Sequence, residues 1–181
     1  MEKYVNEIIP TLCSEFKISS KMAAPKLRKV VINMGVGKLV KDTNVREALV
    51  RDLALITGQK PAVKAAKVSI SAFNLRRGMP VGLIVTLRGS RMYDFVDRLF
   101  SIVLPRFRDF RGLKLTSFDK NGNYSLGIID HTVFPEIDLG KSSAPHGFEV
   151  TIVTNTQNIS QAKRLLELLG MPFEKGEKVK E

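Results

Sequence analysis

The sequence has few of the residues that build disulfides and metal centres. Cys13 is the single cysteine among 181 residues, tryptophan is absent, and histidine occurs twice. A lone cysteine can neither form an internal disulfide nor supply a cysteine metal cluster. His131 and His146 stand fifteen positions apart, which is not a metal-ligand spacing. We therefore expect no bound metal.

Long apolar stretches are also missing. The longest apolar runs, such as residues 81–87, fall far short of the roughly 20 residues that span a bilayer. The first residues, MEKYVNEIIPTLCSEF, lack the apolar centre and small-residue cleavage site of a signal peptide. We expect a soluble, cytoplasmic protein with no membrane partner.

Motifs for nucleotide binding and catalysis do not appear either. The glycines at 35 and 37 follow a predicted strand, but Val40 stands where a dinucleotide-binding fingerprint needs its third glycine. No phosphate loop ending in Gly-Lys-Ser or Gly-Lys-Thr occurs. Glu136 and Asp138 could pair as carboxylates, although their surroundings indicate a structural turn. We expect no catalytic residue, no cofactor and no enzyme.

The sequence does have a large excess of positive charge. Lysine and arginine number 29 against 18 aspartates and glutamates, which gives a net charge of +11. Residues 57–111 hold 11 basic and 3 acidic side chains, whereas residues 112–181 hold 8 and 9. A positive charge that only kept the protein soluble would not need to be concentrated in the middle of the chain. A basic block of this kind is typical of proteins that bind RNA or another polyanion.

Apolar periodicity predicts a mixture of helices and strands. Helical spacing indicates four helices, the first kinked or restarted at Pro10 and the third capped by Ser90, at about 5–16, 44–56, 91–103 and 159–169. Alternating apolar residues, bounded by turn-forming residues such as glycine and proline, indicate five strands. These lie at about 29–34, 64–71, 81–88, 124–129 and 148–154.

The mixed order of these elements predicts an α+β fold, mostly antiparallel, with helices packed on one face of the sheet. The polar sheet face and the loops would then face RNA. The length suggests one domain over residues 1–181. Within it we expect an N-terminal helix at about 2–17, a core at about 25–172 and a charged tail at 173–181.

Strand alternation indicates which sheet face would meet RNA. In the strand at 81–88, alternate apolar residues suit the core, while Thr86 and Arg88 lie on the opposite face. Asn33 takes the polar face of the strand at 29–34. An arginine fork matches phosphate geometry, and threonine can bond phosphate or sugar. Each residue alone is more simply a solvated side chain, but together they favour a binding surface.

Two loops offer further basic surface. In the loop at 73–80, Arg76 and Arg77 stand between apolar Phe73 and Met79, so phosphate and base contacts are both possible. The loop could equally be a basic hairpin that touches nothing. The stretch at 105–112 interleaves arginine with phenylalanine, although its aromatic rings could simply anchor it to the core.

Longer motifs carry a resemblance to a known family. They run in order along nearly the whole chain: PKLRKV (25–30), NMGVG (33–37), ITGQKP (56–61), VTLRG (85–89), RMY (91–93), PRFRDFRGL (105–113), SFD (117–119), GNYS (122–125) and FPEI (134–137). In these motifs the chain resembles a family of bacterial ribosomal proteins, the fifth protein of the large subunit. Members of this family bind 5S ribosomal RNA.

The resemblance implies a structural protein of the central protuberance that attaches 5S rRNA there. Its other partners would be 23S rRNA, the peptidyl-site tRNA, neighbouring large-subunit proteins, and a small-subunit protein at an inter-subunit bridge. By resemblance, the 5S rRNA-binding positions would be Asn33, Gln59, Lys60, Lys64, Lys67, Ser69, Thr86, Arg88 and Arg91. The loop facing tRNA would contain Phe73, Asn74, Arg76, Arg77 and Met79.

The bridge region implied by the resemblance contains Arg111, Lys141 and His146. His146 departs from the family pattern, which has a basic residue at that place. At neutral pH this weakens a charge-based contact.

A different class of protein also fits the charge, namely a basic interaction module that binds another RNA, an acidic protein or a membrane surface. A membrane-surface module would need a sustained basic amphipathic helix. The predicted helix at 91–103 carries Asp94 and Asp97, so it does not qualify.

Overall fold

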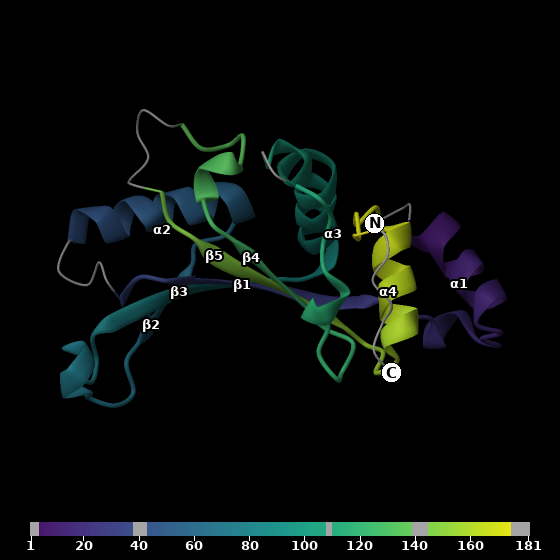
Figure 1. Ribbon diagram of the computed structural model, residues 1–181, viewed down its shortest axis with the longest axis horizontal. Helices are drawn as coiled ribbons and strands as arrows, with labels where there is room; N and C mark the ends of the chain where they lie inside the picture. The colour runs from purple at the N-terminus through teal and green to yellow at the C-terminus, as the bar shows by residue number, and fades with distance from the viewer. Residues whose placement is uncertain (1–3, 38–42, 108–109, 139–144, 175–181) are drawn as a thin grey trace. The chain divides into compact units, whose positions relative to one another are not determined.

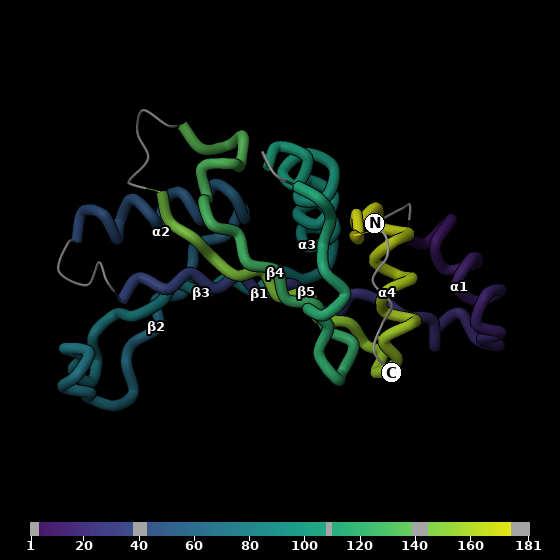
Figure 2. The backbone as a smooth tube through the Cα atoms, in the orientation of Figure 1, coloured from purple at the N-terminus to yellow at the C-terminus, as the bar shows by residue number. Residues whose placement is uncertain are grey.

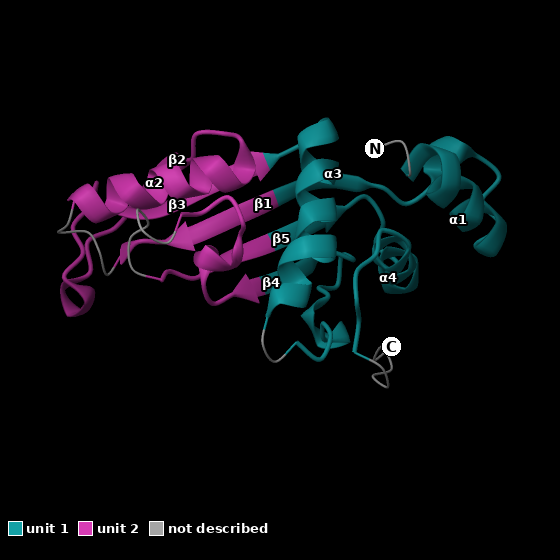
Figure 3. Ribbon diagram, turned by 90° about the horizontal axis from the view of Figure 1, so that it is seen from above, with its two compact units in different colours: residues 1–30, 87–126, 151–181 teal, residues 31–86, 127–150 magenta. Residues whose placement is uncertain are grey.

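The structure is a computed structural model that describes residues 4–37, 43–107, 110–138 and 145–174. The chain forms two compact units (Figure 3). Unit 1 consists of residues 1–30, 87–126 and 151–181, and unit 2 of residues 31–86 and 127–150. Several predicted positions lie outside the described residues: the start of the first helix (1–3), Val40, residues 108–109, Lys141, and residues 175–181 of the tail.

Four α-helices and five strands make up the described chain (Figure 1). The helices are α1 (Ile9–Glu15), α2 (Thr43–Thr57), α3 (Gly89–Arg98) and α4 (Ile159–Leu168). The strands are β1 (Leu27–Gly35), β2 (Ala62–Ala65), β3 (Pro80–Leu87), β4 (Tyr124–Ile128) and β5 (Phe148–Thr154). No helix among these described segments is both long enough and apolar enough to cross a membrane.

The strands form one sheet in the order β2-β3-β1-β5-β4. β2 pairs antiparallel with β3, with Ala62 opposite Ile84 and Lys64 opposite Gly82. The chain order differs from the spatial order because β1, first in sequence, lies in the centre. The result is a five-stranded antiparallel sheet with four helices, so the predicted α+β fold is confirmed.

In unit 2, α2 covers one face of the strands (Figure 1). Leu49, Leu53 and Ile56 of its apolar stripe are fully buried, as are Ile32 and Met34 of β1. Thr57 ends the helix by donating its hydroxyl to the Leu53 carbonyl at 2.7 Å. Gly58 follows with φ of 66°, a left-handed turn that glycine adopts without steric cost.

In unit 1, α1 and α4 lie side by side (Figures 1 and 3). Arg164 of α4 binds Glu15 of α1 with two bonds, of 2.6 and 2.8 Å. The hydrogen bond from this guanidinium lowers the pKa of Glu15. Pro10 stands in the first turn of α1, directly after a π-helical turn at Tyr4–Ile8. The predicted restart of the first helix at Pro10 is therefore confirmed.

The predicted strand at 64–71 is wrong in position. β2 begins at Ala62 and ends at Ala65, where its pairing with β3 becomes irregular. Beyond Ala66 the chain leaves the sheet, and Ile70 pairs instead with Leu75. The alternating polar and apolar residues of this stretch follow a small hairpin rather than a strand of the sheet.

The predicted cap of the third helix is also wrong. α3 begins at Gly89, and its N-cap is Arg88, which contributes no side-chain bond. Gly89 adopts φ of 63°, which glycine allows at little cost, so the chain turns into the helix before it reaches Ser90. The helix continues as a π-helical turn at Leu99–Val103, where Pro105 follows as predicted.

Candidate nucleic-acid interface

Alternation on the central strands confirms the predicted division of the sheet into two faces. Val30, Ile32 and Met34 of β1 are fully buried, whereas Asn33 is exposed. On β3 the predicted core residues Leu83, Val85 and Leu87 are buried, although Val81 is half-buried. Thr86 is half-buried, and Arg88, directly after the strand, is exposed. We call the polar side the open face.

Asn33 extends over the neighbouring strand on this open face. A Cβ atom at Gly82 of β3 would stand 3.8 Å from the Asn33 Oδ1 atom and 3.5 Å from the Met34 carbonyl oxygen. These are ordinary van der Waals distances, so they show that the amide of Asn33 lies against β3 at Gly82. An amide in that place can donate to and accept from an RNA sugar or base edge.

The edge of the sheet beside this face is basic and exposed. All four residues of β2 are exposed, including Lys64, and so is Lys60 in the turn after α2. The backbone of Gln59 in that turn is fixed by Thr57, whose hydroxyl oxygen accepts the Gln59 N–H at 3.3 Å. The predicted positions at 59, 60 and 64 thus lie on one ordered segment of unit 2.

The loop between β2 and β3 is an ordered extension of their hairpin (Figure 2). Gly78 donates its N–H to Ala66 at 3.0 Å, and Arg77 donates its N–H to the Ser69 hydroxyl at 2.9 Å. Asn74 turns the tip with φ of 52°. The Ser69 hydroxyl, predicted to face RNA, is therefore already engaged in shaping the loop.

These loop contacts leave the long side chains of the tip outside. Arg76 and Arg77 are exposed, and Phe73 keeps 73% of its surface exposed. An aromatic ring and two guanidinium groups on a shaped loop can stack on a base and bind phosphate. Lys67 is exposed as well, and Met79 is half-buried at the base of the loop.

None of the lysines and arginines described in unit 2 forms an ion pair. The Lys and Arg pairs that are seen belong to unit 1, where Arg164 binds Glu15 and Glu167, and Lys163 binds Glu167. Cations without a carboxylate partner keep their full attraction for phosphate. Unit 2 therefore presents its positive charge in a form available to RNA.

The other predicted positions are more scattered. Arg91 is exposed near the start of α3, and Arg111 is exposed in the segment that precedes Leu115. His146 is half-buried, and its Nε2 atom lies 2.6 Å from the Gly35 carbonyl oxygen. That bond holds the end of β1 against the segment that enters β5, so His146 has a structural contact whatever else it binds.

A buried polar cluster in unit 2 was missed by the sequence reasoning. His131 is fully buried, and its Nε2 atom lies 3.2 Å from the Asp52 carboxylate. Its Nδ1 atom lies 3.2 Å from the backbone nitrogen and oxygen of His146. No local signal marks Asp52 in the sequence of its helix, and the residues it meets are far away along the chain. Across the described ranges no group of three or more metal-ligating side chains forms.

An antiparallel sheet with one polar face, an exposed basic edge and free cations defines a class, namely structural proteins that bind RNA by shape and charge. Comparisons with known proteins agree with that class. Residues 20–76 match the family model described as ribosomal protein L5, and residues 80–173 match the model that describes the C-terminus of the same ribosomal family.

Curated bacterial relatives extend the match over nearly the full length. The "Large ribosomal subunit protein uL5" of Chloroflexus aurantiacus is 56% identical over 172 residues, which is 95% of this chain and 96% of the relative. The proteins of the same name from Ruminiclostridium cellulolyticum and Dictyoglomus turgidum are 53% and 51% identical, again over at least 95% of each chain.

The chain belongs to the ribosomal protein L5 family. This family is structural and not enzymatic, so the expectation that the chain is no enzyme is confirmed.

Proposed function

We propose that this chain, a structural protein of the large ribosomal subunit in the cytoplasm, binds 5S rRNA through the open face and the adjoining basic edge. The binding residues would be Asn33, Gln59, Lys60, Lys64, Lys67, Ser69, Thr86, Arg88 and Arg91. The observation that carries this proposal is the set of unpaired cations in unit 2 beside an open face with the exposed amide of Asn33 and the half-buried hydroxyl of Thr86.

The chemistry of this surface suits a folded RNA. Cations neutralise phosphates and release counterions, which provides affinity without sequence preference. Asn33 and Thr86 can bond to 2′-hydroxyl groups in the wide, shallow minor groove of an RNA helix. A sheet surface positions these short side chains more rigidly than a loop does. Recognition would therefore depend on RNA shape more than on individual bases.

The hairpin loop supports a second contact within the same function. We assign Phe73, Asn74, Arg76, Arg77 and Met79 to the peptidyl-site tRNA. The hydrogen bonds within the hairpin loop already fix its backbone, so little conformational entropy is lost when the loop binds, and this favours affinity. The bridge to a small-subunit protein would use Arg111, Lys141 and His146. With 23S rRNA and neighbouring large-subunit proteins, these complete the proposed partners.

The test is the double variant Thr86→Ala/Arg88→Ala, measured by filter binding to a 5S rRNA transcript. Removing one guanidinium and one hydroxyl contact should weaken binding by about 3 kcal/mol, or roughly a hundredfold. The matched control is Lys114→Ala/Thr116→Ala, which also removes one positive charge and one hydroxyl, at exposed positions of unit 1.

The control variant should bind 5S rRNA as the unaltered chain does, and both variants should keep its thermal unfolding midpoint. Unchanged affinity in a folded Thr86→Ala/Arg88→Ala variant would refute the assignment of the open face.

A further inference from the structure

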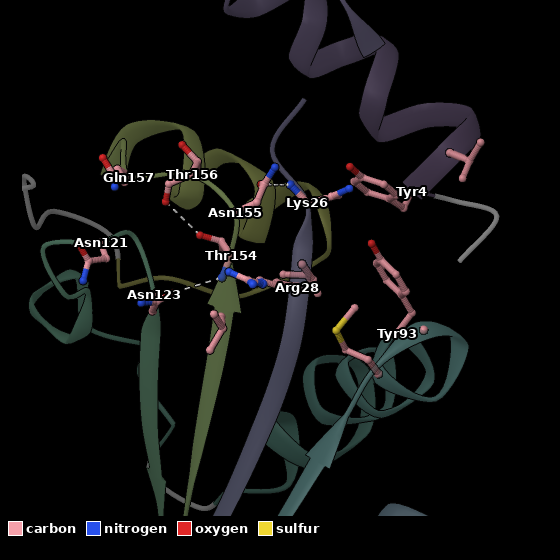
Figure 4. Close-up of a pocket in the computed structure, with 15 residues that line it drawn as sticks. Tyr4, Lys26, Arg28, Tyr93, Asn121, Asn123, Thr154, Asn155, Thr156 and Gln157 are labelled. Carbon is pink, nitrogen blue, oxygen red and sulfur yellow. Dashed lines mark hydrogen bonds between the residues drawn. The ribbon is translucent and has the colours of Figure 1, made fainter. Parts of the chain in front are cut away.

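Unit 1 contains a cavity of about 780 Å³ that the proposed 5S rRNA surface does not use (Figure 4). Its walls come from five separate stretches of chain: residues 4–5, 26–28, 89–93, 121–123 and 153–157. A volume of this size lies in the range of small-molecule and cofactor sites, which is about 300–1,000 Å³. The cavity is therefore large enough for one nucleotide.

The charge of the cavity has one sign. Lys26 and Arg28 line it, and no aspartate or glutamate is among its lining residues. Both cations are exposed, and neither is ion-paired within the part of the chain that the structure describes. A cavity with two free cations and no carboxylate attracts an anion rather than a basic peptide.

Several polar lining residues are committed to holding the walls in place. Asn155 accepts the N–H of Lys26 at 2.6 Å, and Asn123 accepts the N–H of Thr154 at 3.2 Å. The Thr154 hydroxyl donates to the Gly122 carbonyl at 3.0 Å. The cavity is therefore a shaped feature of unit 1, built by side chains from distant segments.

Other polar groups are left over. The side chains of Asn121 and Gln157 line the cavity, and among the described residues neither has a hydrogen-bond partner. Figure 4 shows them on the two loops at one end of the cavity. An amide offers a donor and an acceptor together, which is what the edge of a nucleobase requires.

Two aromatic rings close the other end. The rings of Tyr4 and Tyr93 stack with centroids 5.5 Å apart and an angle of 29° between their planes. Tyr4 is buried and donates its hydroxyl to the Pro25 carbonyl at 2.9 Å, whereas Tyr93 is half-buried. Phenols are neutral at neutral pH, so neither ring repels a phosphate, and burial raises the pKa of both still further. Tyr93 thus offers a ring on which a base can stack.

We propose that this cavity binds one unpaired nucleotide of a structured RNA, as a second RNA site of the chain. Lys26 and Arg28 hold its phosphate, Tyr93 packs against its base, and the amides of Asn121 and Gln157 meet the base edge. The inference rests on the proposed function in so far as the partner is RNA. It uses different residues, so it can fail by itself. The nucleotide could belong to the 5S rRNA on the open face or to another ribosomal RNA segment.

The experiment places p-azidophenylalanine at position 93 and irradiates assembled large subunits that contain the variant chain. We expect a crosslink to one unpaired ribosomal RNA nucleotide, which sequencing then assigns to 5S rRNA or to the larger RNA. Adding Lys26→Ala/Arg28→Ala should lower the yield about tenfold, because two charge-assisted contacts are lost. The matched change Lys114→Ala/Lys120→Ala, at exposed positions that do not line the cavity, should leave the yield unchanged.

A second measurement uses the full chain alone. Titration with a single-stranded adenosine tetranucleotide should shift the NMR signals of Tyr93, Asn121 and Gln157, and the Lys26→Ala/Arg28→Ala variant should lose these shifts. A crosslink to protein instead of RNA, a yield that ignores Lys26 and Arg28, or a titration without shifts at these residues would each overturn the proposal. Filter binding of 5S rRNA to the same variants reports separately on the open face.

Discussion

The two compact units differ in how they use some of their charged side chains. Unit 2 buries a polar pair, His131 with Asp52, and leaves its described lysines and arginines without carboxylate partners. Unit 1 pairs the cations of α4 on its surface, as in Arg164 with Glu15, leaves others such as Lys26 and Arg28 unpaired, and shapes an exposed turn with the Asp119 carboxylate. Net charge therefore does not identify a binding surface by itself. What matters is whether the cations are already neutralised within the fold.

The position of each charged group also decides what it contributes to stability. A buried pair is costly to break because the remaining partner stays desolvated. An exposed pair contributes little because water and salt screen it. We therefore expect that removal of a carboxylate costs far more in the core of unit 2 than on the surface of unit 1.

The largest effect should follow Asp52→Ala. The substitution removes the partner of a fully buried imidazole, so the free energy of unfolding should fall by about 3 kcal/mol. Urea denaturation followed by circular dichroism measures this difference. Arg51→Ala, at an exposed position of the same helix, should change the value by no more than about 0.5 kcal/mol. If Asp52→Ala lowered the free energy of unfolding as little as Arg51→Ala does, the proposed difference between the units would be contradicted.

A smaller effect should follow Asp119→Ala. This carboxylate accepts N–H bonds from Asn121 at 2.9 Å and Asn123 at 2.7 Å, and the Asn123 amide at 2.8 Å. The loss should be about 1 kcal/mol near pH 7, because the turn is exposed. Urea denaturation of this variant beside the unaltered chain measures it.

The contribution of Asp119 should also depend on pH. Burial alone would raise the pKa of Asp119, but the bonds from Asn123 and Asn121 outweigh it and lower the pKa below the ordinary 3.8. A carboxyl with a lowered folded pKa stabilises the fold above its unfolded pKa and loses that contribution as pH falls through the folded value. The difference between Asp119→Ala and the unaltered chain should therefore be constant above about pH 4 and shrink below it. If the difference in free energy of unfolding increased as the pH fell, the lowered pKa of Asp119 would be contradicted.

Local patterns in the sequence predicted much of the fold. β5 spans 148–154 as alternation indicated, and α2 ends at the glycine that was expected to stop it. The division of β1 and β3 into core and open faces also followed from alternation. These features depend on neighbours two to four residues apart, so a single sequence displays them.

Features built by distant contacts were not visible in the sequence. His131 meets Asp52 across 79 positions, and the cavity of unit 1 joins five stretches of chain. β2 was misplaced because its ends depend on pairing with β3 rather than on its own alternation. Lys60 and Lys64 were predicted from the resemblance and the basic block, but only the structure shows that they are exposed and unpaired.

The most direct test of the central claim is the salt dependence of 5S rRNA binding. Each lysine that neutralises a phosphate contributes about one to the slope of log affinity against log salt concentration. Lys60→Ala/Lys64→Ala in unit 2 should therefore lower the slope by about two, whereas Lys163→Ala/Arg164→Ala, which removes paired cations of unit 1, should leave it unchanged. Equal slopes for the two double variants would contradict the claim that unpaired cations of unit 2 bind the RNA.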